Sequence, residues 1–202
     1  DFFDLWGQSA GRLMPHLHLP AQSGSDAVLR RMARRNRVAD FEALVAAARS
    51  RIPDLTITTD LIVGFPGESE SDFADTVAFA RRVGFAHMHV FPYTARQGTP
   101  AAHFSNQMPA PERKRRARTL VELDGELGLA VRRAAVGQTR PVLWENAVAD
   151  ATGRRVWAGL TDNYLRVATT TEADDMLHNS ITAVRLIGLD GDSLMGEIVR
   201  QR

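Results

Sequence analysis

Hydrophobic residues in the first 100 positions follow two alternating spacings, one typical of strands and one typical of helices. Short extended runs are expected at residues 17–19, 55–63 and 88–91, and the second is rich in β-branched residues, as in a strand buried on both faces. Helical spacing recurs near residues 25–34, 41–52 and 73–84, with Ser25 as a predicted cap and Gly84 as a predicted stop. This order predicts right-handed βαβ units with parallel strands. Three strands are few for a closed sheet, so we expect the sheet to begin before residue 1.

The remaining sequence has a different pattern. Pro109 and Pro111 precede a long helix with one apolar stripe, made of Leu120, Leu123, Leu127 and Val131. After Gly137, short extended runs separated by turn residues are expected at 141–144, 155–159, 164–167, 181–186 and 194–199. Five short antiparallel strands predict a small closed barrel of the oligonucleotide-binding kind. We therefore predict an α/β fold, with part of a parallel (βα) barrel and its long helix in residues 1–135 and an antiparallel five-stranded barrel in 136–202.

Composition restricts the chemistry available to the chain. The sequence of 202 residues is 44% hydrophobic and 24% charged, ordinary values for a globular protein with a core. It contains no cysteine, which excludes disulfides, a cysteine nucleophile and thiolate-held zinc or iron–sulfur clusters within it. No apolar run approaches the roughly 18 residues of a membrane span, and no export signal is visible. We expect no membrane partner and a cytoplasmic location.

The formal net charge is only +1, but its distribution is uneven. Residues 1–135 carry 18 basic and 15 acidic side chains, whereas residues 136–202 carry 7 and 9. The most basic segment is 113–118 (RKRRAR). It fits either a solvated helix face or a phosphate-binding surface.

Four segments resemble the radical S-adenosylmethionine methylthiotransferases in their order and spacing. They are 18–26 (HLPAQSGSD), 57–68 (ITTDLIVGFPGE), 89–93 (HVFPY) and 98–102 (GTPAA). Near the C-terminus, 159–164 (GLTDNY) and 195–197 (MGE) resemble the RNA-binding TRAM domain that ends those proteins. The resemblance covers nearly the whole chain. It implies that residues 1–135 are the C-terminal portion of the radical domain, containing its fourth to sixth strands, and that residues 136–202 are the TRAM barrel.

The resemblance also implies an activity for the parent protein. Such enzymes cleave S-adenosylmethionine reductively, and the resulting radical takes hydrogen from carbon two of a tRNA adenosine, which then receives a methylthio group. Their [4Fe-4S] clusters are held by cysteines that this chain lacks, so we expect a missing N-terminal cluster-binding segment and an inactive chain in isolation. The alternative from another class is a non-catalytic RNA-binding fragment.

The substrate branch is inferred from two places in the sequence. Thr58-Thr59-Asp60 and the segment 89–93 resemble the branch that acts on threonylcarbamoyl-adenosine beside the tRNA anticodon. The isopentenyl-adenosine branch and the branch that modifies a ribosomal protein remain alternatives.

The candidate cofactor residues lie where the predicted strands meet the following loops, the edge at which α/β proteins bind ligands. Serine and glutamine can hydrogen-bond a ribose or carboxylate, glycines allow close backbone approach, and an aromatic ring can pack on adenine. Asp60, inside an apolar strand, needs either an Arg or His partner or the ligand. The resemblance places eight residues at the S-adenosylmethionine pocket: Gln22, Ser23, Asp60, Gly64, Gly67, Glu68, Phe91 and Tyr93. Ordinary turn and helix-cap roles are the alternative for Ser25, Gly64 and Glu68.

The histidines suggest a different enzyme. His16 and His18, like His87 and His89, share one face of a strand, and with Asp60 between them the pattern fits a metal-dependent hydrolase. Ligands in such barrels lie at the C-terminal ends of strands, whereas His16 and His87 lie toward the starts. We therefore expect no metal site, with His18 and His89 as barrel-interior residues.

RNA contact is expected from basic side chains and from aromatic rings of the predicted barrel. The predicted RNA-binding residues are Arg96, Arg113, Lys114, Arg115, Arg116 and Tyr164. Trp144 and Trp157 fit either base stacking or the core of a small barrel, and the core is the more frequent role of tryptophan in a domain of this size.

Overall fold

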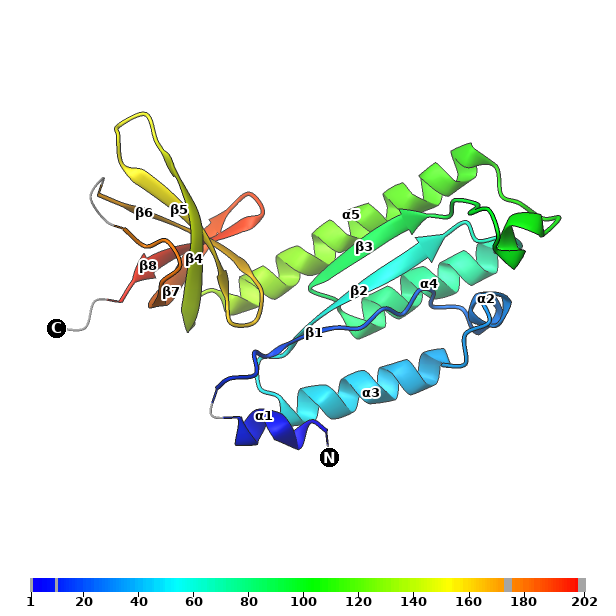
Figure 1. Cartoon of the computed structure of the whole chain (residues 1–202), viewed down its shortest axis with the longest axis horizontal. Helices are drawn as coiled ribbons and strands as arrows, with labels where there is room; N and C mark the ends of the chain where they lie inside the picture. The colour runs from blue at the N-terminus through cyan, green and yellow to red at the C-terminus, as the bar shows by residue number, and fades with distance from the viewer. Residues whose placement is uncertain (1, 10, 173–175, 200–202) are drawn as a thin grey trace. The chain divides into compact units, whose positions relative to one another are not determined.

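In a computed structural model, residues 2–9, 11–172 and 176–199 are described, and the chain divides into two compact units. The first unit comprises Asp1–Gln8 and Leu17–Gly128, and the second comprises Ser9–His16 and Leu129–Arg202. Among the described residues, no helix combines the length and apolar character that a membrane crossing requires. Figure 1 labels the α-helices and strands of both units.

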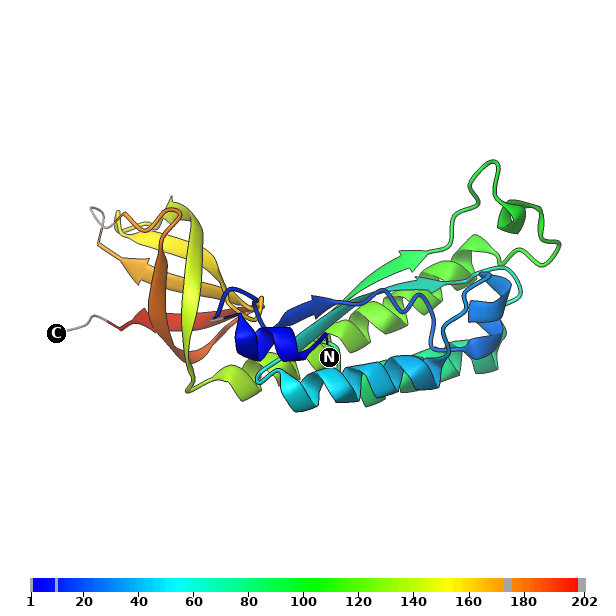
Figure 2. The ribbon, with the colours of Figure 1, turned by 60° about the horizontal axis from the view of Figure 1, so that its bottom comes forward.

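The first unit is a three-stranded sheet covered on one face by helices (Figures 1 and 2). The strand order is β1-β2-β3, and β2 and β3 run parallel. The elements are α1 (Asp4–Gln8), β1 (His16–His18), α2 (Asp26–Arg31), α3 (Val38–Arg51), β2 (Thr56–Val63), α4 (Glu70–Val83), β3 (His87–Pro92), η1 (Pro100–His103) and α5 (Ala110–Ala135). The predicted strand–helix order is confirmed.

Alternation along the strands decides which side chains meet the helices. In β2, Ile57, Leu61 and Val63 are fully buried on the helix face, beside Met88 of β3 and Leu120 of α5. Thr56 and Thr58 on the opposite face are also buried, but Asp60 and Ile62 are only half-buried. The prediction that this strand is buried on both faces is therefore correct for its first half and wrong for its second half.

The helix ends follow local chemistry. Ser25 caps α2 by accepting a hydrogen bond from the Val28 N–H at 3.4 Å. Ser69 and Asp72 form a reciprocal capping box at the start of α4, and Gly84 ends that helix with a left-handed φ of 63°. The Ser25 cap and the Gly84 stop are confirmed.

The second unit is a closed five-stranded barrel with the order β4-β5-β6-β8-β7. Its strands are β4 (Thr139–Ala149), β5 (Arg155–Thr161), β6 (Arg166–Thr171), β7 (Ile181–Asp190) and β8 (Ser193–Ile198). The prediction of an all-antiparallel barrel is wrong at one seam, because β6 pairs with β8 in parallel. A closed ring with an odd number of strands cannot alternate direction all the way round, so one parallel pair is unavoidable.

The barrel core is built around two tryptophans. Trp144 and Trp157 are 0% and 2% exposed and pack with Val142, Val167 and Leu186. Ala135, in the last turn of α5, is buried in the same cluster, and Val131 packs against it. The end of α5 therefore belongs with the barrel, and the compact units divide between Gly128 and Leu129.

Candidate functional site

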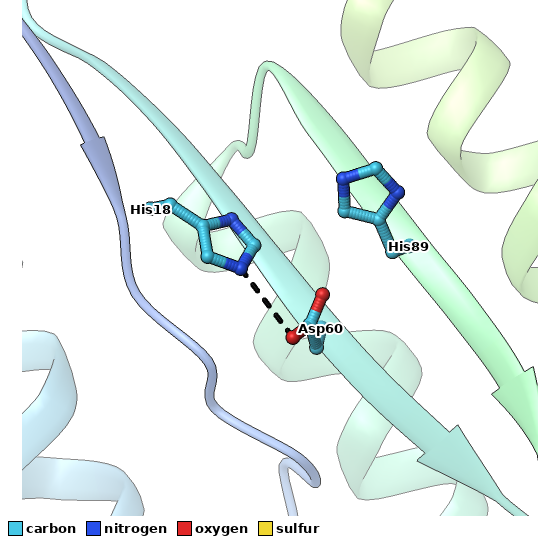
Figure 3. Close-up of side chains that lie close together, drawn as sticks. All are labelled: His18, Asp60 and His89. Carbon is cyan, nitrogen blue, oxygen red and sulfur yellow. Dashed lines mark ion pairs between the residues drawn. The ribbon is translucent and has the colours of Figure 1, made fainter.

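The open face of the first unit's sheet brings three polar side chains together, one from each strand. His18, Asp60 and His89 each offer one ligand atom, and these atoms all lie within 4.8 Å of one another (Figure 3). They share a face because Asp60 and His89 are register partners on the parallel strands β2 and β3, while β1 lies along the other edge of β2. We call these residues the histidine–aspartate cluster.

Asp60 has the histidine partner that its place in an apolar strand requires. His18 Nε2 lies 3.4 Å from Asp60 Oδ2, and His18 Nδ1 lies 2.9 Å from the hydroxyl oxygen of Thr58. Each of the two His-x-His pairs of the sequence supplies only one histidine to the cluster. His87 instead contacts Asp124 at 2.9 Å, and the ring of His16 stacks on that of Tyr164 at 4.5 Å.

The loop after β1 is built from hydroxyl groups that bond to the protein itself. Ser23 is 1% exposed; its Oγ lies 3.3 Å from Thr76 Oγ1 and accepts the N–H of Ser25 at 3.1 Å. Gln22 has a left-handed φ of 68°, which is unusual for a non-glycine residue. Its N–H donates to the Asp60 carbonyl and its carbonyl accepts the Ile62 N–H, so both backbone groups bond to β2. Ser23 therefore shapes the loop, while Gln22 is the half-buried residue at its turn.

Asp72 of α4 ties this loop to the helix behind it, a role not anticipated above. It accepts hydrogen bonds from Ser25 Oγ at 2.6 Å and Arg31 Nη2 at 2.9 Å, besides those of the Ser69 cap. Burial by itself would raise the pKa of Asp72, but the bonds from Ser25, Ser69 and Arg31 outweigh it and lower the pKa to about 2. The signal available in the sequence was the Ser-x-x-Asp spacing of a capping box.

We expect Asp72→Asn to lower the free energy of unfolding by about 1–2 kcal/mol at pH 7. Because the pKa of Asp72 in the folded state lies below its ordinary value of 3.8, the ionised carboxylate stabilises the fold above about pH 3.8. This stabilisation is lost as the pH falls through about 2. The difference between wild type and variant should therefore shrink between about pH 4 and pH 2. Urea unfolding across that range measures it. The exposed Asp75→Asn on the same helix is the control, and an equal change in both variants would contradict the assignment.

The loop after β2 is closed by a buried ion pair. The side chain of Glu68 is 0% exposed, and its Oε2 accepts the Gly64 N–H and Arg116 Nη1, each at 2.7 Å. Burial raises the pKa of Glu68, although the bonds from Arg116 and Gly64 oppose the shift. Protein groups thus hold Glu68 through its Oε2 atom.

Gly64 and Gly67 are needed for close approach, but the groups that approach are protein side chains. Both have left-handed φ angles, 71° and 80°. A Cβ at Gly64 would collide with the side chain of Arg113, and one at Gly67 with Asn106. Packing within the chain therefore accounts for both glycines.

Three buried polar atoms at this end of the sheet have no hydrogen-bond partner among the residues that the structure describes. They are Glu68 Oε1, Tyr93 Oη and Arg31 Nε. The Tyr93 ring packs edge-on against Phe65 at 5.2 Å, and the Arg31 side chain lies near Gly67. Buried groups of this kind are normally satisfied, so they are candidates to bind a polar ligand. Phe91 on β3, 50% exposed, adds an apolar surface on the open face.

The predicted RNA-binding helix is not a uniform cationic surface. Arg116 is 4% exposed and contacts Glu68, Glu70 and Glu112, so its guanidinium is engaged within the chain and little of it is open to a phosphate. Arg115 is half-exposed but paired with Glu112 and Glu70, whose hydrogen bonds raise its pKa. These pairs were not anticipated from the basic run, because the acidic partners come from other turns and elements.

The other predicted cations differ in their surroundings. Lys114 and Arg96 are exposed. Arg113 is half-buried and donates to the Tyr93 carbonyl at 2.7 Å. Lys114 and Arg96 therefore have the greater access to a phosphate backbone.

The aromatic residues of the barrel divide into core and surface. Base stacking by Trp144 and Trp157 is excluded by their burial, and Trp144 Nε1 donates to Thr182 Oγ1 at 2.8 Å. Tyr164 is 58% exposed, in the turn between β5 and β6, with a left-handed φ of 69°. It was predicted within a strand; the turn places its ring on the surface, where it stacks on His16.

Comparison with known proteins gives a consistent picture. Residues 8–80 match the Radical SAM superfamily. The tRNA-2-methylthio-N(6)-dimethylallyladenosine synthase of Ehrlichia chaffeensis is 34% identical over 95% of this chain and 43% of its own length. The threonylcarbamoyladenosine tRNA methylthiotransferase MtaB of Thermotoga maritima is 42% identical over 66% of this chain and 31% of its own.

A third relative, the tRNA-2-methylthio-N(6)-dimethylallyladenosine synthase of Acidothermus cellulolyticus, is 46% identical over 71% of this chain and 28% of its own length. The chain spans less than half the length of these relatives. The match to the Ehrlichia protein, over 95% of the chain, takes in both compact units. The chain belongs to the radical S-adenosylmethionine methylthiotransferase family.

Proposed function

We propose that this chain supplies part of the S-adenosylmethionine pocket and the RNA-binding region of an enzyme that adds a methylthio group to carbon two of a tRNA adenosine. The observation that carries the proposal is the set of unsatisfied and exposed groups at the strand ends, in a chain whose relatives are tRNA methylthiotransferases. A tRNA substrate is consistent with a cytoplasmic enzyme. The barrel in residues 136–202 would be the TRAM domain.

The residues present fit S-adenosylmethionine in part. Glu68 Oε1 and Tyr93 Oη are buried acceptor and donor groups without a partner in the described part of the chain, and Phe91 offers a ring for adenine. Gln22 and Asp60 are half-buried at the same sheet. Ser23, Gly64 and Gly67 would act indirectly, by holding the two loops in shape. When bound, the cofactor supplies one-electron chemistry, and this chain's residues would orient it and exclude water.

The iron–sulfur clusters of such enzymes do not fit the residues of this chain. Their ligands are thiolates, and the sequence has no cysteine. We propose that another segment of the same protein holds the clusters and that this chain is inactive alone.

For the substrate branch, we propose threonylcarbamoyl-adenosine. Thr58-Thr59-Asp60 and the segment 89–93 support it, as does the similarity to the Thermotoga protein. The similarity to dimethylallyladenosine synthases supports the second candidate, an isopentenyl-type adenosine.

Nucleoside analysis of tRNA tests both the activity and the branch. We expect that inactivating the gene for this chain in its source organism removes the methylthio group from threonylcarbamoyl-adenosine and leaves the unmodified precursor. Mass spectrometry of digested tRNA measures the change, with the reintroduced gene as control. Loss of a methylthio-isopentenyl nucleoside would indicate the other branch. Unchanged methylthio nucleosides would contradict the enzymatic function and favour an RNA-binding protein.

A salt titration tests the RNA-binding residues. The slope of log affinity against log salt is negative, and removing one cation that touches a phosphate should make it shallower by roughly 0.7–0.9. We expect Arg96→Gln with Lys114→Gln to make the tRNA-binding slope shallower by about 1.4–1.8. Tyr164→Ala should weaken binding by about 1–3 kcal/mol with an unchanged slope, because stacking neutralises no phosphate.

The matched control is Arg51→Gln, an exposed cation that ends α3 and pairs with Asp4. It should leave both affinity and slope nearly unchanged. If the double variant keeps the wild-type slope, Arg96 and Lys114 are solvated residues, and they must be removed from the proposed interface.

A further inference from the structure

We propose that the histidine–aspartate cluster (His18, Asp60 and His89) binds one divalent transition-metal cation of the Zn²⁺ or Fe²⁺ kind. Two imidazoles and one carboxylate are the ligand set typical of such ions where further coordination positions stay open. This site shares Asp60 with the proposed cofactor contacts, and the metal ion goes beyond both the cofactor and the RNA contacts. It is opposite to the expectation from sequence that no metal site is present, and the titration below decides between them.

The spacing of the ligand atoms fits an ion. Bonds of about 2.0–2.2 Å to nitrogen and oxygen place neighbouring ligand atoms roughly 3.0–3.5 Å apart around a metal. His18 Nε2 and Asp60 Oδ2 are 3.4 Å apart, inside that range and longer than the roughly 2.7–2.9 Å of a charge-assisted hydrogen bond. The ligand atom of His89 lies within 4.8 Å of the other two, and its side chain is exposed and can turn toward them.

A second layer of contacts orients the first histidine. Thr58 Oγ1 lies 2.9 Å from His18 Nδ1, and Thr58 is 6% exposed, so the ring is held with Nε2 directed at Asp60. Histidines that bind metals typically use their second nitrogen in such an outer hydrogen bond. Thr58 is therefore a positioning residue for the site.

The neighbouring groups leave room for a water or another ligand on the metal. In this chain the side chains of His18 and Asp60 are 40% and 28% exposed, so solvent reaches the site. His87 packs against His89 at 4.6 Å between ring centroids, but its Nδ1 is engaged by Asp124. The three strands thus supply three ligands on one face of the sheet.

Calorimetric titration of the metal-stripped chain with Zn²⁺ tests the site. We expect about one ion per chain, with the affinity at least ten-fold lower in each of His18→Ala, Asp60→Ala and His89→Ala. Thr58→Val should weaken binding by about 10–100-fold, and Thr58→Ser should restore it. Circular dichroism checks that each variant is folded.

Two controls distinguish this site from surface histidines. His103→Ala and His178→Ala remove histidines outside the cluster and should leave the affinity unchanged. Mg²⁺ should not compete, because it prefers all-oxygen ligands. In proton NMR, Zn²⁺ should shift the imidazole signals of His18 and His89 and leave those of His103 and His178 in place.

Absence of a stoichiometric Zn²⁺ site, or equal affinity in wild type and Asp60→Ala, would overturn the proposal and leave a simple His–Asp contact. The titration contains neither S-adenosylmethionine nor tRNA, and the nucleoside analysis does not measure metal binding. A failure of this proposal is therefore distinguishable from a failure of the proposed function.

Discussion

Replacement of Arg116 by methionine is expected to lower the free energy of unfolding of the first unit by about 3–5 kcal/mol. The guanidinium donates from Nη1 to Glu68, from Nη2 to Glu70 and from Nε to Glu112, at 2.7, 2.9 and 2.8 Å. It also lies over the Phe73 ring at 5.1 Å. Without it, the carboxylate of Glu68 keeps its buried position but has no compensating charge.

The pH dependence of this effect has a definite sign. Burial already raises the pKa of Glu68, and removal of Arg116 takes away one of the bonds that oppose this shift, leaving that of Gly64. Protonation of Glu68 therefore removes the unpaired charge. The loss in free energy of unfolding caused by Arg116→Met should become smaller as the pH falls. Urea unfolding monitored by circular dichroism at several pH values measures it.

Two variants serve as controls for Arg116. Arg115→Met removes the neighbouring guanidinium, which is half-exposed and pairs with Glu70 and Glu112, so a much smaller effect on stability is expected. The double variant Glu68→Gln with Arg116→Met removes both charges and should recover part of the stability. Equal destabilisation by the two arginine variants would show that Glu68 does not depend on Arg116.

Replacement of Trp144 by alanine is expected to destabilise the barrel by about 3–5 kcal/mol. The ring is fully buried, and its Nε1 donates to Thr182. The fit around it is close, because a Cβ added to Gly159 would lie 2.8 Å from the Trp144 ring. The substitution removes this packing and leaves a cavity that the neighbouring strands cannot fill.

Hydrogen exchange measured by mass spectrometry resolves the effect by unit. Faster exchange is expected across β4–β8, with little change in β2 and α4 of the first unit. Val148→Ala, at a residue 68% exposed on the same strand, is the matched control and should exchange like wild type. Unchanged protection of the barrel in Trp144→Ala would show that the ring is not a major part of its core.

Local patterns in the sequence were sufficient for the strands and the longer helices of this protein, but not for the short α1 and η1. The β-branched run at 55–63 became β2, the apolar stripe after Pro111 became α5, and five runs after Gly137 became five strands. Such predictions succeed because side-chain alternation and helical periodicity depend on near neighbours. The parallel seam between β6 and β8 also follows from the number of strands, once the barrel is closed.

Only the tertiary structure decided the partners of the charged and aromatic residues. The segment 113–118 is basic in sequence, yet Glu68, 48 positions from Arg116, makes that arginine a buried structural residue. His18 reaches Asp60 from the neighbouring strand, and the barrel core encloses Trp144 and Trp157. Sequence determines the spacing of side chains within an element. The partner of a buried charge depends on which distant element folds against it, because burial makes an unpaired charge costly wherever its partner lies in the chain.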